Sequence, residues 1–305
     1  MSQIREAIRP TTFIYPEKLR NYLGLEVVII SETFQHTGSF KFRAAYNLAI
    51  NVPNQMILTA SSGNFGQALA RACQIVGKSC IVVMPETSAK TKIEAVKSYG
   101  AVVDLIDTSK VSRNDRVREL AKQMPEAYVA SAYDDVFVIE GNSSLGEEIS
   151  AVDLDIVISP VGGGGLISGI ATGLRKMSSK AEIIGAEPAL ANDAARSLKE
   201  GRLIANEKEP NTIADGARTQ SLGKLNWEII KSEVKRIFEV PEMLISEAVR
   251  LYFHLVNLKV EPTGALSLGA VLLEPEFFRE KKIGLVVSGG NVDCDVYLKI
   301  LNGEL

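Results

Sequence analysis

One lysine of this chain lies where a lysine is unusual. Lys41 stands between two phenylalanines, Phe40 and Phe42, at the expected first turn of a helix that follows Thr-Gly-Ser (37–39). Such an amine suits an ion pair, a phosphate contact or a covalent bond to an aldehyde. The last is possible because burial lowers the pKa of lysine and leaves a neutral, nucleophilic amine. Other features of the sequence are needed to decide among these three roles.

A run of four glycines is the second chemical feature. Gly162, Gly163, Gly164 and Gly165 follow the apolar run DIVIS (155–159) and lead into a helical pattern. Backbone N–H groups in such a turn can approach an anion, and the helix N-terminus adds partial positive charge. The spacing matches neither GxGxxG nor GxxxxGK[ST]. A tight packing turn is the alternative, but four glycines exceed what packing requires, so the run predicts a phosphate site.

Two further junctions between a strand and a helix carry polar side chains. TASSGNFGQALA (59–70) places serines and Asn64 at a helix start, which suits a carboxylate or a phenolic oxygen. In GLVVSGGNVD, Ser288 ends a strand and could meet a ring nitrogen. N-capping explains a single serine in each place. Together with Lys41 and the glycine run, however, these groups match the phosphate, phenolic oxygen, ring nitrogen and aldehyde of pyridoxal 5′-phosphate.

Short β-branched runs alternate with helical patterns along the chain. Such alternation favours mostly parallel sheets with helices on both faces, whose ligand sites lie at the carboxyl ends of strands. One helix is predicted from an N-cap at Ser88 to a stop at Gly100. The predicted strands are 27–30, 56–60, 80–84, 102–106, 128–130, 155–159, 182–187 and 283–288.

The composition excludes several classes of function. The 305 residues include 34 basic and 37 acidic ones, so the chain offers no electrostatic surface for nucleic acid. Its apolar runs are too short to span a bilayer, and the N-terminus lacks the core of a secretion signal, so we expect a cytoplasmic protein without a membrane partner. With two histidines, and three cysteines without CxxC spacing, histidine-rich metal sites and most Ser-His-Asp arrangements are poorly supplied.

Seven stretches, in order between residues 33 and 293, carry a family resemblance. The chain resembles the fold-type II (β-family) pyridoxal-phosphate enzymes, in particular the serine/threonine dehydratase and serine racemase group. The stretches are TGSFKFRAA, SSGNFGQALA, VGGGGLISGIA, GAEP, TIADGAR, EPTGA and VVSGGNVD. The resemblance implies an α/β, two-lobed, tryptophan synthase β-like fold, with a mostly parallel sheet flanked by helices in each lobe. It further implies a large cofactor-binding domain (1–50 plus 134–305), a small domain (51–133) and a homodimer.

The resemblance also implies a role for each matching residue. Lys41 would hold the cofactor as a Schiff base and move the Cα proton of the substrate, and Phe40 would pack beside the ring. Ser62 would contact the substrate and, as in the racemases, act as an acid/base on the opposite face of the ring. The other implied contacts are the phenolic oxygen at Asn64, the pyridine nitrogen at Ser288, the phosphate at Gly162, Gly163, Gly164 and Gly165, the ring at Gly216, and the substrate carboxylate at Ser62, Gly63, Asn64 and Phe65.

A cation site is implied at GAEPALAND. In the racemase group the ligands correspond to Glu187, the carbonyl of Ala191 and Asp193. Two carboxylates and a carbonyl suit Mg²⁺ or Ca²⁺, with waters completing the shell. Without the resemblance, two surface acids at a helix start would be the simpler interpretation.

The implied reaction is α,β-elimination from a β-hydroxy amino acid, such as L-threonine, L-serine or a 3-hydroxyaspartate, to a 2-oxo acid and ammonia. A serine or aspartate racemase is the alternative in the same site, and a pyridoxal-phosphate binding protein without catalysis is the alternative from another class. The chain has SAYDD (131–135) where relatives usually have HPYDD, and GNSSLGEE (141–148) where they have GQGT. The first departure leaves the side-chain preference open, and the second is interpreted as helix packing.

Overall fold

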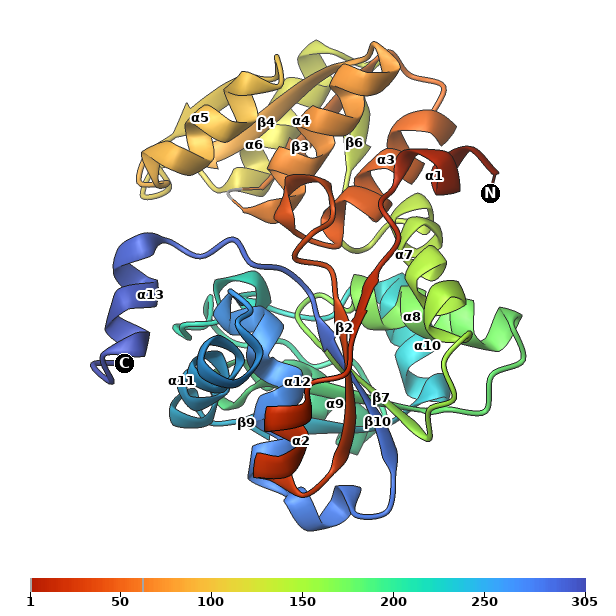
Figure 1. Cartoon of the computed structure of the whole chain (residues 1–305). Coiled ribbons are helices and arrows are strands. Elements are labelled where there is room, and N and C mark those ends of the chain that lie inside the picture. Colours follow the sequence, from red (N-terminus) through yellow and green to blue (C-terminus); the bar gives the residue numbers. More distant parts are fainter. Residues whose placement is uncertain (1, 62) are drawn as a thin grey trace.

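The computed structural model describes residues 2–61 and 63–305 and folds them around two separate sheets (Figure 1). The larger sheet has the strand order β1-β2-β10-β7-β8-β9, and only its edge pair β1–β2 is antiparallel. Its strands are β1 Thr12–Ile14, β2 Glu26–Ser31, β7 Ile156–Pro160, β8 Glu182–Pro188, β9 Val234–Val240 and β10 Lys282–Val287.

The smaller sheet is parallel throughout. Its strand order is β5-β4-β3-β6. The strands are β3 Met56–Ala60, β4 Ser79–Pro85, β5 Val102–Ile106 and β6 Tyr128–Ala130. Two largely parallel sheets flanked by helices confirm the predicted fold class, and each predicted strand is present to within one residue at either end.

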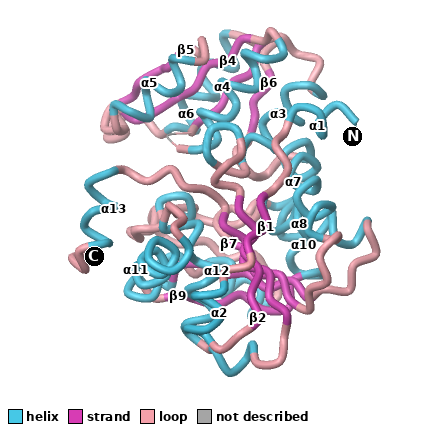
Figure 2. The backbone as a smooth tube through the Cα atoms, viewed as in Figure 1, coloured by secondary structure: helices cyan, strands magenta, loops and turns pink. Residues whose placement is uncertain are grey.

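Helices surround the strands of both sheets (Figure 2). They are α1 Ser2–Ala7, α2 Glu17–Leu23, α3 Lys41–Asn51, α4 Asn64–Val76, α5 Lys90–Ser98, α6 Arg113–Gln123, α7 Val136–Ile149, α8 Gly165–Lys176, α9 Asp193–Glu200, α10 Lys224–Glu233, α11 Glu242–Leu251, α12 Pro262–Leu273 and α13 Cys294–Leu301. Short helical turns are η1 His36–Gly38, η2 Ala189–Ala191, η3 Asp215–Ala217, η4 Tyr252–Val256 and η5 Pro275–Phe278. Within the described ranges, no helix has the length and apolarity needed to cross a membrane.

Alternate residues of the central strand β7 face two different cores. Ile156 and Ile158 are buried in a cluster that includes residues of α11 and α12, whereas Val157 is buried in a cluster with residues of α8 and α10. Because successive side chains of a strand point to opposite faces, these helices must cover the two faces of the sheet. The continuous apolar run at 155–159 follows from this burial on both sides.

Helix α3 belongs to the core beneath the smaller sheet. Phe42 and Leu48 of α3 are buried in one cluster with Ile57 of β3 and Val138 of α7. Lys41, the first residue of α3, therefore starts a helix that is held firmly along its length.

One predicted helix boundary is wrong. Helix α5 starts at Lys90 with Ala89 as its N-cap, and no side chain caps it. The backbone N–H of Ser88 instead donates to the carbonyl of Pro85 at 3.0 Å, which keeps Ser88 in the turn before the helix. At the other end Gly100 takes φ +82° and donates its N–H to Lys97, two residues beyond Ser98.

Candidate active site

The amine of Lys41 is enclosed by two aromatic rings and a carbonyl. Its Nζ donates to the carbonyl oxygen of Ala132 at 2.7 Å and lies 5.0 Å from the ring centre of Phe40 and 5.7 Å from that of Phe65. Burial lowers the pKa of Lys41 from 10.5 to about 8, against an opposing effect of the carboxyl group of Glu261. A lysine with this pKa is partly neutral near physiological pH, as a nucleophilic amine must be.

Two loops at strand ends hold the start of α3. The N–H of Phe40 donates to the carbonyl of Ser288 at 2.9 Å, and Ser39 pairs with Gly289 in an isolated bridge. Ser288 is 1% exposed, and its Oγ has no hydrogen-bond partner within the described residues. A buried hydroxyl without a partner is rare in a folded protein and suits a ligand atom, as the prediction of a ring-nitrogen contact requires.

The first turn of α4 forms a second wall. Asn64 is its first residue, Gly63 is its N-cap, and Phe65 is buried. The first N–H groups of a helix lack intrahelical acceptors, so the turn can receive a carboxylate. Ser61 does cap this turn, because its Oγ accepts from the N–H of Gly66 at 3.0 Å. Ser62, the predicted acid/base, lies outside the described residues.

The side chain of Asn64 joins the N-cap of α12 to the loop that follows β10. Its Nδ2 donates to Glu261 Oε1 and Oε2 at 3.1 and 3.0 Å, and its Oδ1 accepts from Asn291 Nδ2 at 2.8 Å. We predicted no role for Glu261 or Asn291 from the sequence, although they lie in EPTGA and SGGNVD, which carry the family resemblance. A polar residue in a glycine-rich or proline-rich junction was the signal that could have identified them.

The glycine run turns from β7 into α8. Gly164 is the N-cap of α8 and takes φ +91°, which favours glycine. A Cβ at Gly163 would lie 2.3 Å from the ring of Tyr133, and one at Gly164 would lie 2.9 Å from Asn226 Cβ. Similar close contacts arise at Gly162 and Gly165, each at 3.0 Å from a backbone oxygen. Packing therefore requires glycine at positions 163 and 164 and leaves little room for a side chain at 162 and 165, so our argument that four glycines exceed what packing requires was wrong. The phosphate contact stays a prediction.

The divergent loop SAYDD braces the glycine run. Asn226 Nδ2 donates to the carbonyls of Tyr133 and Gly163 at 3.0 and 2.8 Å. Asp134 accepts from the N–H groups of Lys224 and Leu225 at the start of α10. This loop also supplies the carbonyl of Ala132 that contacts Lys41, so the departure from the family pattern lies directly at the site.

Gly216 lies beside the glycine run. Its N–H donates to Thr263 Oγ1 at 3.0 Å, and its carbonyl oxygen is the atom that a Cβ on Gly162 would meet. The structure thus brings Phe40, Lys41, Asn64, Gly162, Gly216 and Ser288 to one place through contacts among their loops.

Glu261 is a buried carboxyl group at this place. It is 2% exposed, and burial first, then the charge of Asp215, raises its pKa from 4.5 to about 8. Asp215 is paired with Lys92 of α5 at 3.0 Å. Of these two acids only Glu261 is withdrawn from water, because the side chain of Asp215 is 42% exposed.

The predicted cation ligands form a separate pair. Glu187 accepts from the N–H groups of Ala194 and Ala195 at 3.2 and 2.6 Å, and Asp193 Oδ1 accepts from Asn206 at 2.8 Å. Asp193 Oδ2 is buried and has no hydrogen-bond partner in the part of the chain that is described. Burial raises the pKa of Glu187, and it raises that of Asp193 to about 7. The described residues contain no cluster of three or more metal-binding side chains.

The residues present fit pyridoxal 5′-phosphate. The unpartnered Ser288 Oγ, the amide of Asn64, the N-terminus of α8 and the low-pKa amine of Lys41 offer one group for each polar part of that cofactor. Phe40 and Phe65 add apolar faces.

Comparison with known proteins gives the same result. A family model described as "Pyridoxal-phosphate dependent enzyme" matches residues 4–289. The beta-hydroxyaspartate dehydratase of Paracoccus denitrificans (strain Pd 1222) is 34% identical over 299 residues, which cover 96% of this chain and 94% of that protein. The serine racemase of Schizosaccharomyces pombe is 35% identical, with 98% of this chain and 94% of that protein covered.

A solved structure, the T.th. threonine deaminase, is 36% identical and superimposes with a TM-score of 0.90, covering 96% of each chain. The three relatives differ in the reaction that their names give, but they share one fold and, with this chain, one family. This chain is a member of the pyridoxal-phosphate dependent enzymes, in the serine/threonine dehydratase and racemase group.

Proposed function

We propose that this protein is an ammonia-lyase that eliminates water from a β-hydroxy amino acid and releases a 2-oxo acid and ammonia. The substrates we consider are L-threonine, L-serine and 3-hydroxyaspartate. The observation that carries the proposal is the buried amine of Lys41, with a pKa of about 8, in one site with the unpartnered hydroxyl of Ser288. Pyridoxal phosphate, when bound, supplies an electron sink for bonds broken at Cα.

Lys41 has two tasks in this reaction. Its neutral amine would hold the cofactor covalently and, when free, would take the proton from Cα of the substrate at Nζ. The rings of Phe40 and Phe65 keep water from the amine, and the carbonyl of Ala132 holds it in place. The lowered pKa serves both tasks because each needs an unprotonated Nζ.

Ser288 favours elimination over racemisation. A hydroxyl at the ring nitrogen, unlike a carboxylate, does not keep that nitrogen protonated, so negative charge at Cα is stabilised less. Loss of the β-hydroxyl, which leaves as water with the proton that Nζ of Lys41 has taken from Cα, would then compete well against return of that proton to Cα. The enamine released in this way tautomerises and is hydrolysed to the 2-oxo acid and ammonia, which balances the loss of one water by the gain of another.

The substrate is oriented by the first turn of α4. We place its carboxylate at Gly63, Asn64 and Phe65, whose N–H groups lie at the positive end of a helix of 13 residues. Ser62 directly precedes Gly63 in the sequence. Asn64 Nδ2 would donate to the phenolic oxygen of the cofactor, the N-terminus of α8 with Gly162 to Gly165 would receive the phosphate, and Gly216 would line the ring.

The test is a panel of β-hydroxy amino acids, each assayed for 2-oxo acid release and for inversion at Cα. We expect 2-oxo acid and ammonia in equal amounts from at least one L-amino acid. Inversion without 2-oxo acid would make the protein a racemase instead. If protein that carries the cofactor forms neither product from any amino acid of the panel, the result would favour a binding protein without catalysis.

The pKa of Lys41 predicts how cofactor uptake depends on pH. Because the pKa is lowered to about 8, the neutral amine is populated above that pH rather than above 10.5. The rate at which cofactor-free protein gains the visible absorbance of the bound cofactor should therefore rise about tenfold per pH unit below pH 8 and level off above it. Stopped-flow absorbance between pH 6 and 10 measures this rate.

Nα-acetyllysine, treated with the same cofactor solutions, is the control for the cofactor's own ionisation. Its rate should keep rising up to about pH 10, as the ordinary pKa of a lysine in water dictates. A protein profile that parallels this control would contradict the lowered pKa of Lys41.

We propose that Glu187, the carbonyl of Ala191 and Asp193 bind a divalent cation, Mg²⁺ or Ca²⁺. The unpartnered Asp193 Oδ2 and the nearby Glu187 supply the oxygen ligands that hard cations prefer. A cation would compensate two carboxyl groups that burial otherwise disfavours in their charged form.

Cation binding predicts stabilisation. At a hundredfold excess over Kd, Mg²⁺ or Ca²⁺ should raise the free energy of unfolding by about 2.7 kcal/mol, and EDTA should reverse the rise in Tm. Asp193→Asn should lose the response, whereas the exposed Asp295→Asn should keep it. An equal response in both variants, or none in the wild type, would rule out this site.

The remaining assignments concern the whole molecule. We propose a small domain of residues 51–133, which contains all strands of the smaller sheet, inserted into a large domain of residues 1–50 and 134–305. We further propose a homodimer in the cytoplasm. Light scattering of the purified protein tests the dimer, and cell fractionation tests the location.

A further inference from the structure

The amide of Asn64 is held at both of its ends. Oδ1 accepts from Asn291 Nδ2 at 2.8 Å, and Nδ2 donates to both carboxylate oxygens of Glu261 at 3.0 and 3.1 Å. Asn291 Nδ2 also donates to the carbonyl of Thr37 at 2.7 Å. A carbonyl only accepts, so Thr37 sets the orientation of Asn291, and the Nδ2 of Asn291 in turn requires the oxygen of the Asn64 amide to face it. Glu261, whose pKa is raised to about 8, still offers the other end of that amide an accepting oxygen.

Asn64 and its two partners, Asn291 and Glu261, lie in three separate elements. Asn291 lies in the loop after β10, Glu261 is the N-cap of α12, and Asn64 opens α4 of the smaller sheet. The side chain of Asn291 packs closely against Gly38, which takes φ +74°. A Cβ on Gly38 would lie 2.5 Å from Asn291 Oδ1. This close packing leaves the Asn291 side chain little freedom to rotate.

The orientation of Asn64 decides whether it can serve the cofactor. The amide nitrogen has two hydrogens, of which one suffices for Glu261 and the other remains for the phenolic oxygen. A reversed amide would instead point its own oxygen at that oxygen, which repels rather than binds. The two ends of the amide have nearly the same shape, so packing alone does not select between them.

We propose that Asn291 is a positioning residue that, together with Glu261, fixes the Asn64 amide with its donor end toward the phenolic oxygen of the cofactor. The inference rests on the proposed function, because Asn64 must be the residue that contacts that oxygen. It adds a pair of residues that act on the cofactor only through Asn64.

An exchange of acid and amide tests the proposal. Asn291→Asp replaces the donor by an acceptor of the same shape, which forces the Asn64 amide to reverse and brings its oxygen against Glu261. The double variant Asn291→Asp/Glu261→Gln gives the reversed amide of Asn64 an acceptor opposite its Nδ2 and a donor opposite its Oδ1, although the new carboxylate still faces the carbonyl of Thr37. Thermal unfolding and the absorbance spectrum of the lysine-bound cofactor are measured for both.

We expect the double variant to regain part of the Tm that Asn291→Asp loses, while its cofactor absorbance stays shifted to the shorter wavelengths of a neutral phenol. Its kcat should stay about tenfold or more below the wild type, as for one lost hydrogen bond to a charged oxygen. A spectrum that recovers together with Tm would show a purely structural role and overturn the proposal, as would a wild-type spectrum in all variants.

Two controls complete the design. Asn54→Asp, at a partly exposed asparagine that donates to the carbonyl of Glu126, should leave the spectrum unchanged. If Asn291→Asp does not fold, Asn291→Ala, which frees the Asn64 amide to turn, should give a partial shift, and an unshifted spectrum there overturns the proposal equally. Wild-type protein that gains no cofactor absorbance would instead refute the proposed function.

Discussion

Replacing Lys41 by alanine is expected to abolish the visible absorbance of the bound cofactor and every reaction at Cα. No other lysine has an amine described near Phe40 and Phe65, and alanine provides neither a covalent attachment nor a base. Loss of a nucleophile that also acts as a base lowers turnover on the order of 10⁴-fold or more. Absorbance spectra and assays of 2-oxo acid release and chiral inversion measure the two effects.

The fold should survive this change. Lys41 is partly buried with a lowered pKa, so its charged form is disfavoured by the folded structure, and removing it leaves no buried acid without its only partner. Lys97→Ala, at an exposed lysine of α5 that pairs only with Glu94 three residues earlier in the helix, is the matched control and should keep both absorbance and activity. Retained turnover in a well-folded Lys41→Ala variant would refute the assignment.

The fold could be predicted from the sequence because most strands are buried on both faces. Such strands appear as short, continuous apolar runs, and the structure confirms each one that we predicted. The two missed strands lack this signal. Strand β1 has three residues at an antiparallel edge, and β9, Val234–Val240, follows α10 without a turn and interleaves Lys235, Arg236 and Glu239 with apolar residues.

The site was only partly predictable, for a different reason. Lys41, Asn64 and Ser288 carry a chemical type and a local setting that a sequence displays. A polar residue in a glycine-rich or proline-rich junction could have marked Glu261 and Asn291 as candidates, but their role lies in contacts with Asn64 across 197 and 227 residues, which no local pattern contains. At the glycine run we underestimated packing, since the ring of Tyr133 and the side chain of Asn226 leave no room for a Cβ at Gly163 and Gly164, while the phosphate contact itself stays a prediction.

The segment GNSSLGEE was predicted to vary through helix packing. It lies within α7, which packs on α8, and a Cβ on Gly169 of α8 would lie 2.3 Å from the side chain of Asn142. Ser144 of the same segment accepts from Arg43 at 3.1 Å. The substitution of polar residues here thus extends a buried polar network beside α3, which the family resemblance did not indicate.

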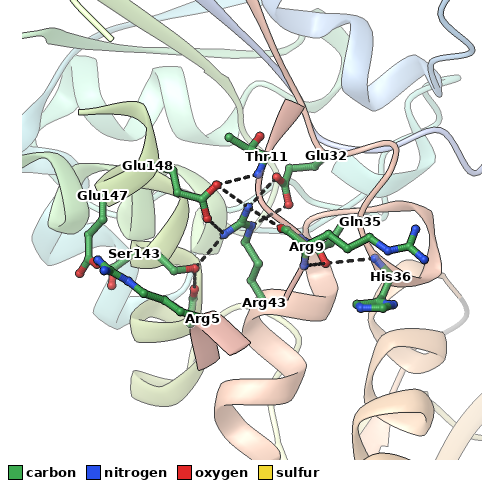
Figure 3. A network of polar contacts seen from close by, with 12 residues as sticks. Arg5, Arg9, Thr11, Glu32, Gln35, His36, Arg43, Ser143, Glu147 and Glu148 are labelled. Atoms are coloured by element: carbon green, nitrogen blue, oxygen red, sulfur yellow. Dashed lines mark hydrogen bonds and ion pairs between the residues drawn. The ribbon is translucent and has the colours of Figure 1, made fainter. Parts of the chain in front are cut away.

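Replacing Arg43 by methionine is expected to lower the free energy of unfolding by about 3–5 kcal/mol. Arg43 and Glu32 are both fully buried, and the guanidinium group donates to Glu32 at 2.7 and 2.9 Å and to Glu148 at 2.6 Å (Figure 3). Burial alone would lower the pKa of Arg43, but the two carboxylates outweigh it and raise the pKa. Methionine fills similar volume, so the loss comes from a carboxylate left buried without its partner.

A double-mutant cycle separates the charge from the packing. Glu32→Gln in the Arg43→Met background removes the stranded charge and should recover part of the lost stability, measured by urea unfolding. Arg118→Ala, at an exposed pair with Asp115, should change stability by only about 0–1 kcal/mol. If Arg43→Met were as mild as this control, the buried network would not stabilise α3. Because Arg43 follows Lys41 by two residues on that helix, we expect the same variant to lose cofactor affinity before it unfolds.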